Sequence, residues 1–261
     1  MAKLNSLISI AQTLQQSDLY AFDSRTLANI FTLNKIQAAH LLHRLEEYSL
    51  VKRVERGKYI LLGLTPERVL SNPLFIASSL ATPSYVSFWS ALHYHGYTDQ
   101  APREVYIATT ITKPQVIFLE NQFHYVTMKP HSFFGYQRDR IADLSVNIAD
   151  EAKALMDSLW LPQYAGGLLE VARALWAALQ KHDSPVLLNS LVEYSNRLGN
   201  GSLGSRLGYL LDFYGQTVHG LQNSSGPVSL DPQIPRCGKY NRRWKVYVNV
   251  EHARLSPEGV V

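Results

Sequence analysis

The chain has 261 residues, 46% of them hydrophobic, and a formal net charge of +4. This apolar content supports packed cores and excludes a disordered chain, and the mildly basic charge is compatible with nucleic-acid binding but excludes a histone-like polycation. No apolar run could cross a bilayer, no signal-peptide core follows Met1, and the single cysteine, Cys237, permits no intrachain disulfide, so we expect a cytoplasmic protein with no membrane contact.

Residues 1–33 predict two amphipathic helices, the second beginning at Ser24. Their apolar residues recur at the spacing that places side chains on one helix face. The residues expected to face inward are Leu4, Leu7, Ile8, Ala11 and Leu14 in the first helix, and Leu27, Ala28, Ile30 and Phe31 in the second. Two helices thus precede the most informative part of the chain.

Residues 34–48 predict a third helix with two contrasting faces. Asn34 can cap its start, and Gln37, three residues later, completes a variant of the capping box. The apolar face carries Ala38, Leu41, Leu42, Leu45 and Tyr48. The opposite face carries Lys35, Ile36, Ala39, His40, His43 and Glu47, with Gln37 and Arg44 at its margins. Such a small, basic and hydrogen-bonding face suits a DNA major groove.

A β-hairpin is predicted after Leu50, because apolar and basic residues alternate on both sides of Arg56-Gly57 and Gly57 supplies a permissive turn residue. The cations expected on or beside its tip are Lys52, Arg53, Arg56 and Lys58. Residues 1–63 contain eight Lys or Arg against five Asp or Glu, a local excess of +3. Three helices followed by a basic hairpin predict a winged helix-turn-helix.

The predicted DNA-binding residues lie on the third helix and the hairpin. They are Lys35, Ile36, Gln37, Ala39, His40, His43, Arg44, Lys52, Arg53, Arg56 and Lys58. The helix residues are the candidates for base edges, and the hairpin cations for salt-sensitive phosphate contacts. Two alternatives are that the winged helix docks a protein, or that the charged hairpin is a solvated edge strand.

We place the first domain at residues 1–65 and the second at 66–261, with an internal boundary near residue 148. The second domain predicts a mixture of helices and strands. Helices are expected over 72–80, over 85–96, from about 150, over 168–179, from 184 and over 203–215, and strands over 104–109, 116–119, 123–129 and 244–250. The expected fold class is therefore α+β, with a winged helix-turn-helix followed by a larger, helix-rich mixed domain.

Four runs in this second domain carry a family resemblance. They are SYVSFWSALHYHGYTDQAPREVYIAT at 84–109, KALMDSLWLPQYAGGLLEVARAL at 153–175, RLGYLLD at 206–212 and WKVYVN at 244–249. In this order, behind a predicted winged helix, they resemble the AbiEi antitoxins of abortive-infection (type IV) toxin–antitoxin systems, over nearly the whole chain. In one departure, the family commonly has Glu directly before the lysine that matches Lys153, whereas this chain has Ala152 there and Glu151 one position earlier.

The resemblance implies a transcriptional autorepressor and antitoxin without enzymatic activity. In that family the N-terminal domain binds inverted repeats in the promoter of its own operon. The C-terminal domain counters a nucleotidyltransferase-like toxin without forming a stable complex with it. The alternative is a winged-helix transcription factor whose C-terminal domain senses a ligand or a protein and has no toxin partner. The oligomeric state stays open.

Other residue patterns offer weaker chemistry. His93 and His95 are two positions apart and point away from each other on a helix, and His40 and His43 lack a third ligand. An acid-acid-x-Lys pattern of metal-dependent nucleases is approached by Asp143, Asp150, Glu151 and Lys153. A helix beginning at Glu151 would place these side chains poorly for that geometry. We therefore expect no metal, no cofactor and no catalytic residue, with a nuclease as the alternative.

The C-terminal segment predicts a second nucleic-acid patch. Its cations are Arg236, Lys239, Arg242, Arg243 and Lys245, interleaved with Tyr240 and Trp244. Cations beside aromatic rings can bind phosphates and stack bases. The patch would extend the DNA footprint or bind RNA. The alternative is a solvated loop and an edge strand with a packed tryptophan.

Overall fold

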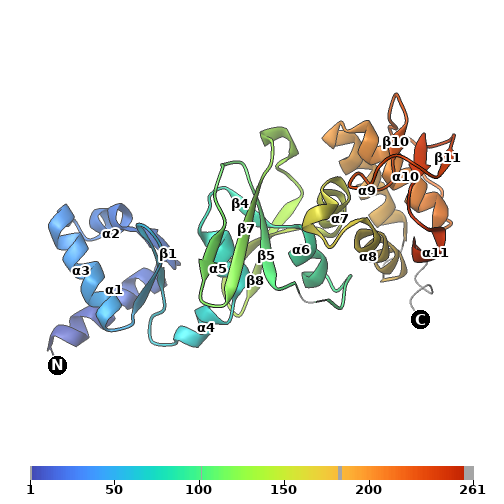
Figure 1. Ribbon diagram of the computed structural model, residues 1–261. Coiled ribbons are helices and arrows are strands. Elements are labelled where there is room, and N and C mark those ends of the chain that lie inside the picture. Colours follow the sequence, from blue (N-terminus) through green and yellow to red (C-terminus); the bar gives the residue numbers. More distant parts are fainter. Residues whose placement is uncertain (1, 101, 182–183, 256–261) are drawn as a thin grey trace.

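The computed structural model describes residues 2–100, 102–181 and 184–255. Three parts follow one another along an elongated molecule, with α1 (Ala2–Gln16) at one end and α11 (His252–Leu255) at the other (Figure 1). No helix in the described ranges is both long enough and apolar enough to span a membrane.

The N-terminal unit packs three helices against a small sheet. After α1 come β1 (Ala21–Asp23), α2 (Ser24–Ile30), α3 (Lys35–Glu47), β2 (Val51–Glu55) and β3 (Lys58–Leu61). The strands form an antiparallel sheet of order β1-β3-β2 with an irregularity between Arg53 and Glu55, so the predicted hairpin is confirmed. Leu14, Leu27 and Leu45 are fully buried between helices and sheet. Each buried leucine of this kind contributes about 1.5–3 kcal/mol of transfer free energy.

The predicted capping box of α3 is confirmed. The Asn34 side chain accepts a hydrogen bond from the Gln37 N–H, and the Gln37 side chain accepts one from the Asn34 N–H, both at 2.9 Å. Ala38, Leu42 and Leu45 are buried as expected. Tyr48 was expected inside but is 46% exposed, because the helix ends at Glu47 and Tyr48 is its C-cap.

The predicted inward orientation of Ile30 is also wrong. Ile30 is the last residue of α2 and is 44% exposed. Leu27 in the same helix is buried. In α2 the burial is therefore complete at Leu27 but not at the C-terminal end of the helix. The side chain of Leu4 lies outside the described residues.

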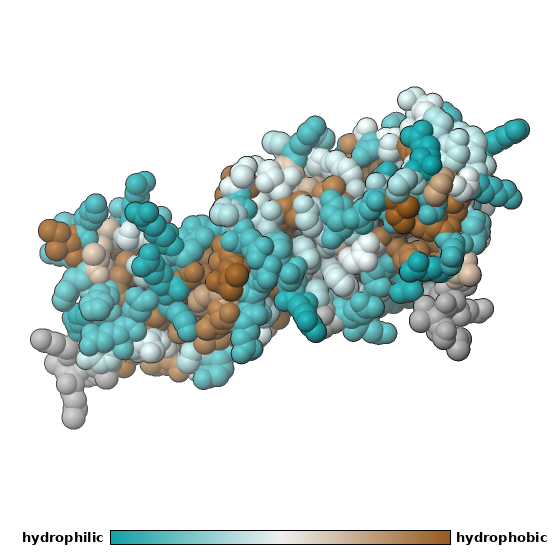
Figure 2. Space-filling view, in the orientation of Figure 1, coloured by the Kyte–Doolittle hydropathy of each residue, from teal (hydrophilic) through white to brown (hydrophobic). Residues whose placement is uncertain are grey.

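The middle part is built on a six-stranded mixed sheet of order β6-β7-β5-β4-β9-β8. Its elements are α4 (Pro66–Leu70), α5 (Pro73–Ser79), β4 (Ser84–Val86), α6 (Phe88–Tyr94), β5 (Glu104–Thr109), β6 (Val116–Phe118), β7 (Asn121–Thr127), η1 (Pro130–Ser132), β8 (Tyr136–Ile141) and β9 (Leu144–Ala149). The pairs β5–β7 and β4–β9 are parallel, and the other neighbours are antiparallel. On the face shown in Figure 2 most of the surface is hydrophilic, and apolar side chains gather in small separate patches.

The prediction of a helix over 85–96 is wrong for its first residues. Ser84–Val86 form the central strand β4 instead, and α6 covers only Phe88–Tyr94. Tyr85 and Val86 are completely buried, with β5 on one side and β9 on the other. Pairing with two neighbouring strands outweighs the helical spacing, which is a local signal.

The C-terminal part packs helices around a small second sheet. It contains α7 (Glu151–Trp160), η2 (Pro162–Tyr164), α8 (Leu168–Lys181), α9 (Ser184–Leu198), α10 (Gly201–Phe213), β10 (Val228–Ser229), β11 (Lys239–Asn241), β12 (Val246–Val248) and α11. Strand β12 lies between β10, which is parallel to it, and β11, which is antiparallel. The predicted helices and the strand near 246–248 are confirmed, and the whole chain has a mixed α+β fold.

A buried polar network joins the middle and C-terminal parts. Lys153 and Asp157 are both fully buried and form an ion pair one turn apart on α7. The Tyr85 hydroxyl and Ser87 Oγ donate to the other Asp157 oxygen at 3.0 and 2.8 Å. Burial raises the pKa of the Asp157 carboxyl, while Lys153 and these donors oppose the rise. Ser87 and Asp157, which are 70 residues apart in the chain, therefore meet in one buried network.

Candidate nucleic-acid interfaces

The outward face of α3 is fully accessible. Ile36 is 80% exposed, and the exposed residues around it are Lys35, Gln37, Ala39, His40 and His43. Arg44, at the margin, is half-buried. Because the Gln37 carbonyl already accepts the Asn34 N–H, its side chain offers mainly its NH₂ group to a ligand. The face can thus supply cationic and donor groups together with apolar contact.

The hairpin cations divide between two environments. Arg53 and Arg56 are exposed, and Arg53 Nε donates to the Glu55 carbonyl at 3.4 Å. Lys52 and Lys58 face the middle part instead: Lys52 Nζ lies 5.8 Å from the Phe118 ring centroid, and Lys58 Nζ donates to the Leu80 carbonyl. Burial, followed by the charge of Lys113, lowers the pKa of Lys58. Arg53 and Arg56 are therefore the hairpin cations most available to a phosphate.

Ion pairs and hydrogen bonds fix the N-terminal unit on the middle sheet. Lys113 Nζ lies 2.6 Å from a Glu55 carboxylate oxygen, and the Lys113 side chain is only 9% exposed. Arg138 pairs with Asp18 at 3.0 Å. These contacts hold one face of the hairpin against the sheet and leave α3 on the outside of the molecule.

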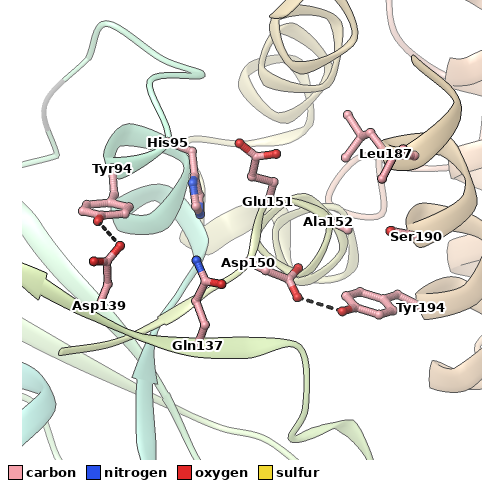
Figure 3. A pocket seen from close by; sticks show the side chains of 11 residues that line it. Tyr94, His95, Gln137, Asp139, Asp150, Glu151, Ala152, Leu187, Ser190 and Tyr194 are labelled. Atoms are coloured by element: carbon pink, nitrogen blue, oxygen red, sulfur yellow. Dashed lines mark hydrogen bonds between the residues drawn. The ribbon is translucent and has the colours of Figure 1, made fainter. Parts of the chain in front are cut away.

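A hollow of about 620 Å³ lies where the middle sheet meets α7 and α9 (Figure 3). Tyr94 donates to Asp139 at 2.6 Å, and Tyr194 donates to Asp150 at 2.7 Å. Burial and these hydrogen bonds raise the pKa of each tyrosine to about 12, so both phenols stay neutral. With Glu151 also in its wall, the hollow presents carboxylates, which disfavour nucleic-acid phosphates.

The residues considered for metal or nuclease chemistry do not converge. Asp150 and Glu151 line the hollow, but Asp143 lies exposed in the β8–β9 turn and the Lys153 ammonium faces Asp157. Over residues 2–100, 102–181 and 184–255 no three His, Cys, Asp or Glu side chains are arranged to hold a metal ion.

The paired histidines have separate hydrogen-bond partners. His93 Nδ1 lies 3.3 Å from the Thr98 carbonyl, and His95 Nε2 lies 2.8 Å from the Ala149 carbonyl. A carbonyl only accepts hydrogen bonds, so the nitrogen beside it must carry the proton in each ring. His93 is exposed and His95 is half-buried against the end of β9.

The C-terminal cations also differ in their partners and exposure. Arg243 pairs with Asp212 at 3.0 Å, Lys245 Nζ donates to the Ser224 carbonyl at 2.9 Å, and Arg236 lies 5.8 Å from the Tyr247 ring centroid. Lys239 and Arg242 are exposed and have no ion pair within the described part of the chain.

Trp244 is packed and Tyr240 is the accessible ring of this segment. Trp244 is 5% exposed and its Nε1 donates to Asp212 at 2.6 Å, as the packed-tryptophan alternative expected. Tyr240 is 37% exposed. The residues that complete its surroundings, Tyr209 and His252, were not predicted from the sequence, because they come from α10 and α11. The spacing of residues along the sequence does not indicate that α10 and α11 lie beside Tyr240.

Together these features define a mixed α+β protein with exposed basic residues at both ends of an elongated molecule. Its fold is similar to the crystal structure of the RV2827C protein from Mycobacterium tuberculosis, with a TM-score of 0.58 and 12% sequence identity. The match covers 96% of this chain and 93% of that chain. No protein-family model matches the chain. No curated protein sequence matches it either.

Proposed function

We propose that this protein is a cytoplasmic, non-enzymatic transcriptional autorepressor and antitoxin, whose N-terminal unit is a winged helix-turn-helix that binds operator DNA. The observation that carries the proposal is the outward face of α3, which is capped, exposed and accompanied by the exposed hairpin residues Arg53 and Arg56. Three helices followed by a hairpin supply the order of elements that such a domain requires.

In the proposed complex α3 enters the major groove by its N-terminal half. Lys35, Gln37 and His40 then reach base edges, with Ile36 available for a thymine methyl group. Arg53 and Arg56 contact the phosphate backbone beside the groove. Because Lys52 and Lys58 face the middle part, we assign them a smaller share of phosphate binding. The ion pair between Glu55 and Lys113 keeps the hairpin in position for these contacts.

The antitoxin assignment rests on the resemblance of the second domain to AbiEi antitoxins. Two of its most specific pieces, around Ser87 and from Lys153 to Asp157, form one buried network. This common location supports a role for those pieces in maintaining the fold. The proposed partner is a nucleotidyltransferase-like toxin, countered without a stable complex.

Binding of the full-length protein to its own upstream DNA, measured over a salt series, tests the DNA-binding part. We expect a preference over scrambled duplex that is lost mainly in Lys35→Ala/His40→Ala. We expect weaker binding with a shallower salt dependence in Arg53→Ala/Arg56→Ala. Arg103→Ala/Lys129→Ala removes two exposed charges from the middle part and serves as the matched control. Equal affinity for both duplexes at every salt concentration would refute operator recognition.

A second candidate is a transcription factor whose second domain senses a small molecule and that has no toxin partner. The hollow lined by Asp139, Asp150 and Glu151 favours it, because three carboxylates could receive a cationic ligand. Co-expression with a nucleotidyltransferase encoded by a neighbouring gene distinguishes the antitoxin from the ligand-sensing transcription factor. Rescue of growth supports the antitoxin, and persistent toxicity with operator binding intact supports the sensor.

A further inference from the structure

Positive charge is concentrated at the C-terminal end of the molecule. Residues 236–255 contain six Lys or Arg and one Glu, an excess of +5 in a chain whose formal net charge is +4. Residues 1–63 carry an excess of +3, and residues 64–235 contain eleven Lys or Arg against fourteen Asp or Glu. The basic C-terminal segment is therefore separated from the basic N-terminal unit by an acidic middle, and Figure 1 places them at opposite ends.

A pocket of about 270 Å³ lies in this basic end. Strand β11 and the residue after it form one wall, and α10, β12 and α11 complete it. The lining residues are Tyr209, Lys239, Tyr240, Asn241, Arg242, Val248 and His252. The Tyr209 hydroxyl lies 3.1 Å from His252 Nε2, which joins α10 to α11 at the pocket. The pocket is smaller than the roughly 300–1,000 Å³ of sites that enclose whole ligands, and its size suits a single planar group.

The wall of the pocket combines free cations with an aromatic surface. Lys239 and Arg242 flank Tyr240 and are exposed, and the structure shows no ion pair for either within the residues that it describes. Tyr240 is 37% exposed and lies opposite Tyr247 across the β11–β12 pair, with ring centroids 4.9 Å apart. A neighbouring aromatic ring holds Tyr240 in place, and its accessible part can take a stacked base.

Hydrogen-bonding capacity is also present. The Asn241 side-chain oxygen accepts the Trp244 N–H at 3.0 Å, which leaves its NH₂ group as a donor toward a ligand. Among the residues that the structure describes, no Asp or Glu lines the pocket. The pocket thus offers cations for phosphate, an aromatic ring for stacking and an amide donor for a base edge, which are the groups that bind single-stranded nucleic acids.

We propose that this pocket binds an unstacked base and the adjoining phosphates of single-stranded nucleic acid, at a site separate from α3. A duplex keeps its bases stacked and presents none to a concave pocket, so the ligand is a single strand. Lys239 and Arg242 hold the phosphates on either side of the base, and Tyr240 stacks on the base itself. RNA and single-stranded DNA share this chemistry, and the 2′-hydroxyl distinguishes them.

Fluorescence anisotropy of the full-length protein with labelled oligouridine and oligodeoxythymidine of equal length tests the proposal, with a heparin fragment as a polyanion without bases. We expect Lys239→Ala/Arg242→Ala to weaken binding of both oligonucleotides at least tenfold, and Tyr240→Ala to weaken it about fivefold or more. Arg103→Ala/Lys129→Ala, with the same change in charge, should leave the affinity within twofold. Tighter binding of oligouridine would identify RNA as the ligand, and equal affinities would support either single strand.

Two outcomes overturn the proposal. One is the absence of measurable binding to either oligonucleotide. The other is a Tyr240→Ala variant that binds the oligonucleotides as tightly as the unaltered protein does, together with a heparin fragment that binds as tightly as the oligonucleotides. The site would then attract any polyanion. Thermal unfolding of each variant verifies that it is folded, and Tyr240→Leu supplies a second non-aromatic variant if Tyr240→Ala is unstable.

The proposal of oligonucleotide binding at the pocket does not depend on operator binding by α3, and the two proposals can be refuted separately. Lys35→Ala/His40→Ala should bind the oligonucleotides normally even if it no longer binds the operator. Saturating operator duplex should not displace a bound oligonucleotide, because the two sites lie at opposite ends of the molecule. Displacement by the duplex would place both ligands on one site and contradict the inference of a separate one.

Discussion

Lys153 and Asp157 bury a complete ion pair in the middle of the molecule. Removal of one partner leaves a charge that neither water nor a counterion can stabilise, and such changes cost about 3–5 kcal/mol. We therefore expect Lys153→Met to lower the free energy of unfolding by about that amount in urea titrations. Lys153→Met/Asp157→Leu removes both charges and should recover part of the loss. A double variant less stable than Lys153→Met would contradict this account.

Gly208 is required by a close contact rather than by its backbone angles. A Cβ at this position would overlap the Trp244 ring. In an isolated helix Gly→Ala stabilises by about 1 kcal/mol, but overpacking a core costs about 1–3 kcal/mol. We expect Gly208→Ala to be net destabilising and to change the tryptophan fluorescence. Gly226→Ala, where an added Cβ meets no atom within 4 Å, is the control and should be nearly neutral.

Asp23 caps α2 and gives the N-terminal unit a pH-dependent stability. Hydrogen bonds from the Thr26 N–H and hydroxyl, at 2.7 and 2.8 Å, lower the pKa of this carboxyl below 3.8. Its stabilising contribution is therefore complete above pH 3.8 and is lost as the pH falls through the folded-state pKa. We expect Asp23→Ala to lower the free energy of unfolding by about 0.5–2 kcal/mol at pH 7. The difference in this free energy between the variant and the unaltered protein should become smaller below pH 3.8. A difference that grows in acid would exclude this carboxyl as the cause.

At the scale of elements, the Glu55–Lys113 ion pair is one of the contacts that hold the β2–β3 hairpin on the middle sheet. The Glu55–Lys113 pair is partly shielded from solvent and lies at hydrogen-bond distance. A double-mutant cycle with Glu55→Ala and Lys113→Ala should give a coupling free energy of about 1–2 kcal/mol in urea unfolding. Either single variant should also increase proteolysis near the hairpin. Additive effects of the two substitutions would mean that the pair contributes nothing to docking.

Elements with strong local signals were predictable from the sequence, and elements made by distant partners were not. The start of α3 follows from Asn34 and Gln37, which are close together in the chain. The β8–β9 hairpin was missed because its turn uses Ala142 and Asp143 at φ of 49° and 63°, where Asn-Gly or Gly would be the usual signal.

The candidate sites divide in the same way. Exposure of the α3 face follows from helical periodicity, which is a property of one segment. The orientation of Lys52 and Lys58 depends on Phe118 and Leu80, which the chain brings back only through the fold. For the same reason the C-terminal cations were visible as a run of residues, but the pocket that Tyr209 and His252 complete was not.

At the scale of the whole molecule, the proposed recognition helix α3 lies at one end and the rest of the chain extends away from it (Figure 1). Two copies can therefore occupy an inverted repeat with their α3 helices on one face of the duplex, if the half-sites are about 34–36 Å apart or a multiple of that distance. We expect a duplex with the full repeat to bind two protomers and a duplex with one half-site to bind one, measured by analytical ultracentrifugation. Insertion of five base pairs between the half-sites rotates one copy to the opposite face, about half a helical turn. Any contact between the bound copies should then be lost, so a cooperative complex becomes non-cooperative, whereas unchanged cooperativity would show that the second domains do not meet on DNA.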